Sequence, residues 1–142
     1  MSVGTGKLWR LAGLLFLLLF LVSCAGTPGQ VKAGLGKEFS LAINQTATIS
    51  GENLKIKLLD IFGDSRCPTG VTCIWAGEVT AVIQIGDTPS TNMTLIEPGH
   101  GDGSNQTYNN YHLSFHVQPY PEAGKSIAKE DYRLLLTVDK QK

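Results

Sequence analysis

The chain has 142 residues, a length typical of one domain, and its 12 basic side chains balance its 12 acidic ones. This balance excludes the basic character on which non-specific binding to nucleic acid depends.

The amino-terminal segment has the three zones of a secretory signal peptide. Lys7 and Arg10 make a positive start, residues 11–22 are apolar apart from Gly13, and small residues follow. A membrane-spanning helix needs about 20 apolar residues, and this run is about a dozen. We therefore expect residues 1–23 to form a signal-peptide helix that is removed, rather than a permanent transmembrane anchor.

The segment Leu21-Val22-Ser23-Cys24 resembles the bacterial lipobox, Leu-x-small-Cys. The resemblance implies that Cys24 receives a diacylglycerol, that cleavage precedes it, and that two or three acyl chains such as palmitate hold the mature protein stably. Ala25 follows in place of Asp, which implies the outer membrane if the host is Gram-negative. The alternative is an ordinary signal peptide with an incidental cysteine.

Removal of the signal takes away two basic residues and leaves 10 basic and 12 acidic side chains, a net charge of about −2. The lipid would supply the contact with the membrane, and no nucleic-acid partner is expected. Cys67 and Cys73 then remain in a compartment that permits disulfides, so we expect them to pair. A two-cysteine zinc site and a redox role are weaker alternatives, because no histidine lies near and the spacing is not Cys-x-x-Cys.

Residues 24–37 are rich in Gly, Ala, Thr and Pro, which predicts a flexible tether, with the folded domain at 38–142. In that domain apolar residues recur at every second position, as in half-buried strands. A phase shift at Leu58-Leu59 indicates a β-bulge. The expected strands are 39–43, 46–49, 54–62, 79–85, 93–95, 111–117 and 132–138.

About seven short strands favour an all-β fold, an antiparallel immunoglobulin-like β-sandwich, with closure into a barrel left open. A short helical turn is expected only within 122–131. Two long connections, 97–110 and 118–131, are candidates for function.

The densest motif runs from Asp64 to Glu78. Its Asp-Ser-Arg-Cys-Pro at 64–68 and Cys-x-Trp-x-Gly at 73–77 resemble a group of uncharacterised small secreted and lipid-anchored bacterial proteins. The similarity extends to Pro119-Tyr120-Pro121 and to Asp131-Tyr132, and it implies a common fold but no activity.

Each residue of the motif has a structural interpretation. We expect Trp75 to pack on or near the disulfide as a core anchor, with an exposed platform for sugar or peptide as the alternative. Arg66 is expected to pair with Asp64 or with backbone carbonyls and so hold the loop in register, with ligand binding by these two residues as the alternative. Gly77 is expected to mark a bend or a close backbone approach.

Other polar clusters are weaker. The Gly-rich segment 98–105 is expected to be a mobile hairpin tip rather than a metal loop. His112 and His116 share the polar phase of one strand about 13 Å apart, too far to bind one metal ion. The sequence carries no catalytic motif and indicates no metal or other cofactor.

The leading hypothesis is a non-enzymatic module, lipid-anchored and extracytoplasmic, that binds an unknown protein partner or has a structural role in the cell envelope. One alternative is an inhibitor of secreted proteases, although the Asn-Pro-Thr-Thr-Gly-Tyr motif of chagasin-type inhibitors is missing from the sequence. Another is a small-ligand carrier, if the sheet closes into a barrel.

Overall fold

The computed structural model describes residues 29–99 and 103–141 of the chain. The signal-peptide helix expected over 1–23, the cleavage site and Cys24 lie outside the described residues. In the part that is described, no helix is both long enough and apolar enough to span a bilayer.

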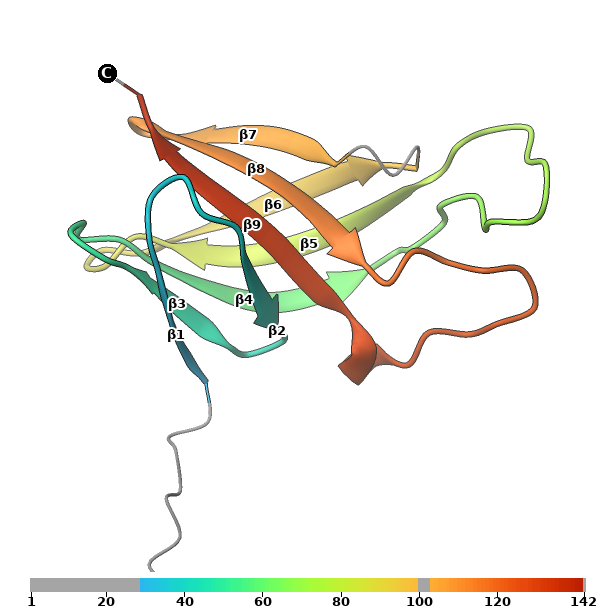
Figure 1. Ribbon diagram of the computed structural model, residues 1–142, viewed down its shortest axis with the longest axis horizontal. Helices are drawn as coiled ribbons and strands as arrows, with labels where there is room; N and C mark the ends of the chain where they lie inside the picture. The colour runs from blue at the N-terminus through green and yellow to red at the C-terminus, as the bar shows by residue number, and fades with distance from the viewer. Residues whose placement is uncertain (1–28, 100–102, 142) are drawn as a thin grey trace, which may run out of the picture.

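The described chain is almost entirely β-structure, as the alternating pattern predicts, and forms two sheets that pack face to face (Figure 1). The first sheet has the strand order β1-β3-β4-β5-β6 and the second has the order β2-β9-β8-β7. The bounds are β1 Gln30–Ala33, β2 Phe39–Ala42, β3 Thr46–Ile49, β4 Lys55–Phe62, β5 Glu78–Ile85, β6 Thr91–Pro98, β7 Ser104–Tyr108, β8 Tyr111–Gln118 and β9 Arg133–Lys140.

Alternation along each strand sends one side chain inward and the next outward, so the inward sets of the two sheets make the core. In β5, Val79, Ala81, Ile83 and Ile85 are all fully buried. The inward residues of β8 and β9 meet them from the other sheet. The sheets are not closed into a barrel, so the fold is a β-sandwich.

The bulge predicted in β4 is confirmed. Leu58 pairs with Ile83 and Asp60 pairs with Val82, so Leu59 is the extra residue. This keeps Leu58 and Ile61 on the inner face although three positions separate them.

Nine strands are present in the described residues, two more than expected. One is β7, a polar strand that runs from Ser104 to Tyr108 within the connection predicted at 97–110. Its pattern escaped prediction because backbone pairing with β8, rather than an apolar face, places it. Residues 100–102 of the predicted hairpin tip lie outside the described residues.

The other additional strand, β1, corrects the boundary of the predicted tether. Residues 30–33 pair with β3, and they do so in parallel, which departs from a purely antiparallel sandwich. Ala33 is buried and Val31 packs against the core. The glycine-rich composition hid this strand, because four residues are too few to show a period. Of the expected tether, at most residues 24–29 precede the first strand.

The connection at 119–132 keeps the length predicted for it, and its short helical turn is the 3₁₀ segment η2, Lys129–Asp131. This connection lies beside the β4–β5 loop, residues 63–77, at one end of the sandwich (Figure 1). Most residues of the sequence motif therefore meet at this end.

Candidate functional site

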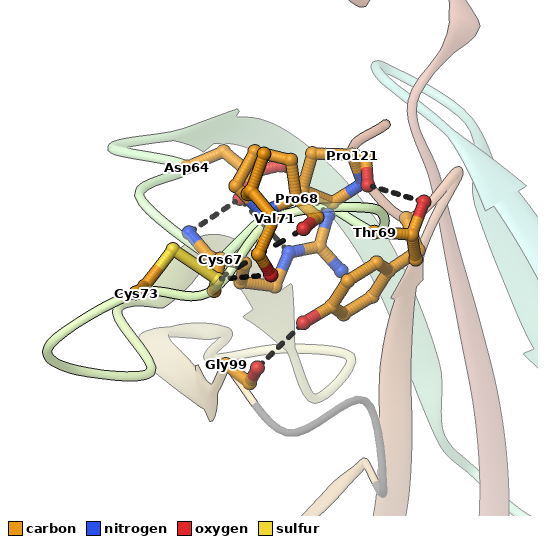
Figure 2. Close-up of a disulfide and its surroundings, with 10 residues drawn as sticks. Asp64, Cys67, Pro68, Thr69, Val71, Cys73, Gly99 and Pro121 are labelled. Carbon is orange, nitrogen blue, oxygen red and sulfur yellow. Dashed lines mark hydrogen bonds and ion pairs between the residues drawn. A yellow bond between two sulfur atoms is a disulfide. The ribbon is translucent and has the colours of Figure 1, made fainter. Parts of the chain in front are cut away.

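The β4–β5 loop projects beyond the sheets and is closed by the disulfide that the sequence predicts (Figures 1 and 2). The Sγ atoms of Cys67 and Cys73 are bonded, and their Cα atoms are 5.9 Å apart. Closing so short a loop stabilises the fold by about 2 kcal/mol in the chain-entropy model. The covalent bond thus limits the shapes that the segment between the cysteines can adopt.

The stem of the loop continues the sheet by backbone hydrogen bonds. The Ser65 amide donates to the Glu78 carbonyl at 2.8 Å, and the Cys67 amide donates to the Ala76 carbonyl at 2.8 Å. The Ser65 hydroxyl adds a second bond to Glu78 O at 3.1 Å. The two arms of the stem are therefore held in register.

Gly77 lies where the loop re-enters β5, and the close approach predicted for it is confirmed. A Cβ atom on Gly77 would lie 1.8 Å from the carbonyl oxygen of Ser65, and its φ of +73° is left-handed. The Gly77 carbonyl also accepts a hydrogen bond from the Gly99 amide at 2.8 Å. Only glycine fits here, because a side chain would force the stem apart.

A second brace comes from the connection after β8. The Thr69 amide donates to Pro121 O at 2.9 Å, and the Ala123 amide donates to Thr69 O at 3.1 Å. These bonds make a parallel bridge between Thr69 and Glu122. The segment closed by the disulfide is thus tied to the β8–β9 connection as well as to its own stem.

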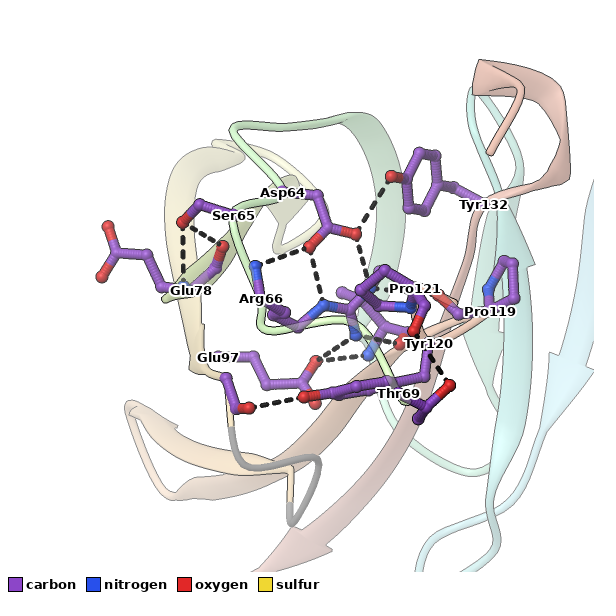
Figure 3. Close-up of polar contacts among 12 residues, drawn as sticks. Asp64, Ser65, Arg66, Thr69, Glu78, Glu97, Pro119, Tyr120, Pro121 and Tyr132 are labelled. Atoms are coloured by element: carbon purple, nitrogen blue, oxygen red, sulfur yellow. Dashed lines mark hydrogen bonds and ion pairs between the residues drawn. The ribbon is translucent and has the colours of Figure 1, made fainter. Parts of the chain in front are cut away.

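Beneath the loop lies a buried polar cluster centred on Arg66, whose side chain is 2% exposed (Figure 3). Its Nε and Nη2 donate to the two carboxylate oxygens of Asp64 at 2.8 and 2.7 Å. Nη1 donates to Val117 O at 2.7 Å and Nη2 to Pro119 O at 3.0 Å. The predicted pairing of Arg66 with Asp64 and with backbone carbonyls is confirmed, and it joins the loop to β8.

Glu97 completes the cluster from β6. Its Oε2 accepts the Val117 amide at 2.6 Å and lies 3.9 Å from Nη1 of Arg66. The sequence analysis missed Glu97, because the strand expected at 93–95 stopped short of it. Its inward phase, two residues after buried Leu95, was the available signal.

One guanidinium thus faces two carboxylates, and their pKa values move in opposite directions. Burial raises the pKa of Glu97, and the bonds it accepts do not offset this. Burial also acts to raise the pKa of Asp64, but the paired hydrogen bonds and charge of Arg66 outweigh it and hold that pKa below its usual value. Burial and the bond to Asp64 raise the pKa of Tyr132 to about 12. Asp64 is consequently the ionised partner of Arg66.

The two tyrosines of the extended resemblance belong to this cluster. The Tyr132 hydroxyl donates to Asp64 Oδ2 at 3.0 Å. The Arg66 guanidinium lies over the ring of Tyr120, with its Cζ atom 4.9 Å from the ring centroid. The Tyr120 hydroxyl donates to Gly99 O at 2.5 Å. Residues from five segments therefore make one rigid frame under the loop.

The prediction that Trp75 is a core anchor is wrong. Its side chain is 80% exposed, and that of Ile74 is 95% exposed. The space beneath the loop holds Arg66 and the ring of Tyr120, so the frame that supports the loop is polar and leaves no apolar pocket for the indole.

Trp75, Ile74 and Val71, which is 51% exposed, are three large apolar side chains turned to solvent on one loop. We call these three residues the apolar tip. Phe62 and Ile96, each about half exposed, flank Thr80 on the outer face of the first sheet.

The described residues contain no group of three His, Cys, Asp or Glu side chains placed to bind a metal ion. His116 contacts the Gln118 amide through its Nε2 at 3.1 Å, and both His112 and His116 are partly exposed, as expected for surface positions. A shallow hollow of about 430 Å³ lies between the β2–β3 turn and η2, lined by Ala42, Ile43, Asn44, Lys129 and Glu130. Its lining offers no pairing of nucleophile and base, so we take the apolar tip as the candidate site.

Comparison with known proteins leaves the function to be argued from this geometry. No family model, no curated protein and no solved structure matches the chain.

Proposed function

We propose that this chain is a lipid-anchored, extracytoplasmic binding module without catalytic activity, which contacts another component of the cell envelope through the apolar tip. Cys24 carries the lipid, and the signal that precedes it directs export. The localisation is the envelope surface or the periplasm, with the outer membrane as the site in a Gram-negative host.

One observation carries the binding role: a rigid frame holds apolar side chains in water. The disulfide, the stem and the Arg66 cluster fix the loop, yet Ile74 and Trp75 gain no burial from it. A loop held rigidly before binding loses little conformational entropy on binding. Tryptophan at the centre of a contact is also among the residues that contribute most to binding.

The anchor is tested by Cys24→Ala in the full chain. The variant is expected to remain an unlipidated precursor, without incorporated palmitate and with the signal still attached. Normal processing and acylation of the variant would refute the anchor.

The contact is tested by a photo-reactive amino acid at position 74 in the lipidated protein, irradiated in intact membranes. An adduct is expected from position 74, whatever component it joins. The matched control is position 37 in the β1–β2 turn at the opposite end of the sandwich, where Lys37 is exposed. Equal labelling from both positions, or none from position 74, contradicts the proposal.

A second candidate function is inhibition of a secreted protease. The same observation supports it, because a disulfide-closed loop with projecting apolar side chains can enter an active-site cleft as a substrate segment does. A panel of secreted proteases assayed with the purified domain decides this, and inhibition must be lost in Ile74→Ser. The carrier alternative required a closed barrel, and the described strands form two separate sheets instead.

A further inference from the structure

We infer that the component contacted by the apolar tip is the lipid bilayer itself: Ile74 and Trp75 enter the interfacial layer of the membrane that carries the protein's own anchor. This inference rests on the proposed function and makes it specific. It replaces the protein partner expected from the sequence.

The direction of β1 relates the start of the domain to the β4–β5 loop. β1 runs parallel to β3 and β3 antiparallel to β4, and the register joins Gln30 to Thr46 and Thr46 to Lys57. β1 therefore begins on the side toward which β4 advances, the side of the β4–β5 loop. By this register, Gln30 and the β4–β5 loop lie toward the same end of the strand pair β3–β4.

The chain between Cys24 and β1 is long enough to bring the loop end of the domain to the membrane. Six Cα steps separate Cys24 from Gln30 in the sequence, and a fully extended chain of that length spans about 20 Å. Along β4, the five steps from Lys57 to Phe62 advance about 17 Å toward the loop. A bilayer that holds Cys24 is thus close enough for the loop end of the domain to rest on it.

The side chains of Trp75 and Ile74 suit the interfacial layer of a membrane. Trp concentrates at the membrane–water interface, where its ring is partly in the apolar layer and its N–H group remains hydrated. Ile74, at 95% exposure, gains from leaving water.

The charges around the tip also permit this contact. At the loop end, Lys129 pairs with Asp60 at 2.8 Å and Lys125 pairs with Glu122 at 2.6 Å, so these two carboxylates add little repulsion from anionic headgroups, and Glu78 is left as an exposed carboxylate at the base of the loop. Since the attraction is apolar rather than electrostatic, it should be insensitive to salt.

Trp75 is itself the probe, because the only other tryptophan, Trp9, lies in the segment expected to be removed. The lipidated protein is reconstituted in vesicles of phosphatidylethanolamine and phosphatidylglycerol, with and without bromine on the acyl chains. We expect Trp75 emission to shift to shorter wavelength in the vesicles and to be quenched by the brominated lipid, at low and high salt alike.

The matched control carries Trp75→Phe and Lys37→Trp together, which moves the probe to the opposite end of the sandwich. Its emission should remain that of a tryptophan in water. In Ile74→Ser the quenching of Trp75 should weaken. Unquenched Trp75 emission in vesicles that carry the protein, or quenching that requires added envelope proteins, overturns the bilayer contact in favour of a protein partner.

Flotation of the vesicles separates this result from the fate of the anchor. Protein that floats with unquenched Trp75 refutes the bilayer contact and leaves the anchor intact. Protein that does not float refutes the anchor. In that case the unlipidated chain from Cys24 onward is coupled through Cys24 to a maleimide lipid, because Cys67 and Cys73 are bonded to each other, and quenching in those vesicles decides the contact.

Discussion

Replacement of Arg66 by Met tests the frame under the loop. Methionine fills a similar space but donates no hydrogen bond and carries no charge. The change leaves Asp64 and Glu97 without their cation and leaves the carbonyls of Val117 and Pro119 without their donor.

The magnitude follows from the burial of the cluster, because the Arg66 side chain is fully enclosed and the Asp64 side chain is only 9% exposed. Removing one partner of a buried ion pair costs about 3–5 kcal/mol. For a domain of roughly 100 residues, each kcal/mol lowers Tm by about 4–8 °C, so we expect Tm to fall by about 10–40 °C. Lys37→Met removes the same charge from an exposed turn and should change stability by no more than about 0.5 kcal/mol.

The assay is urea unfolding followed by far-UV circular dichroism, since an exposed Trp75 is a poor reporter of folding. The loss in Arg66→Met should shrink as the pH falls from 7 to 4. In the variant burial is no longer offset by Arg66 and raises the pKa of Asp64, so protonation between pH 7 and 4 relieves the cost of an unpaired buried charge. The wild-type stability that comes from the lowered pKa of Asp64 is lost only at pH values below the ordinary pKa of the group. Adding Asp64→Asn and Glu97→Gln should recover part of the loss. A pH-independent loss below 1 kcal/mol would show that the cluster is not a structural frame.

The remaining predictions concern the frame and the disulfide. Gly77→Ala should lower the free energy of unfolding by about 3 kcal/mol or more, since backbone strain of about 1–3 kcal/mol adds to the clash with the stem. The control is Gly51→Ala, where φ is a similar +81° but the space is open, so the free energy of unfolding should fall by the strain energy alone. Replacing Cys67 and Cys73 by Ser should cost about 2 kcal/mol and make the loop sensitive to limited proteolysis, with an unchanged cleavage pattern as the contrary result. Glu97→Gln should be neutral or stabilising at pH 7, with an advantage that grows as the pH rises, because ionising a carboxyl of raised pKa costs the native state stability; a large loss equal at pH 4 and pH 8 contradicts this.

Local patterns were sufficient to predict much of the fold. The period of two, the bulge at Leu58 and the disulfide each depend on residues close together in sequence, so they can be recognised without knowledge of the tertiary structure. β7 has no apolar face and is specified by its pairing with β8, while β1, whose only inward apolar residues are Val31 and Ala33, is placed by pairing with β3, 16 residues further along the chain. A sequence pattern does not contain that information.

The candidate site was predicted only in part. Arg66 and Asp64 lie two residues apart, so their pairing could be predicted from the sequence. The close approach of two backbone segments at Gly77 could be predicted as well. The exposure of Trp75 was not, because it depends on Arg66 and Tyr120 occupying the space beneath the loop, and Tyr120 comes from a segment 45 residues further along the chain. A lone tryptophan near a disulfide usually packs on it, and here a polar frame occupies that position.

The proposed role of the apolar tip depends on a rigid frame that presents Ile74 and Trp75 for contact in the envelope. Hydroxyl-radical footprinting read by mass spectrometry compares the unlipidated chain from residue 25 onward, purified in detergent-free buffer, with the lipidated protein in intact envelopes. We predict that Trp75 is oxidised rapidly when purified and is protected in the envelope, while the peptide that contains Lys37 reacts equally in both. Slow oxidation of Trp75 in the purified protein, or equal oxidation in both samples, would contradict the account.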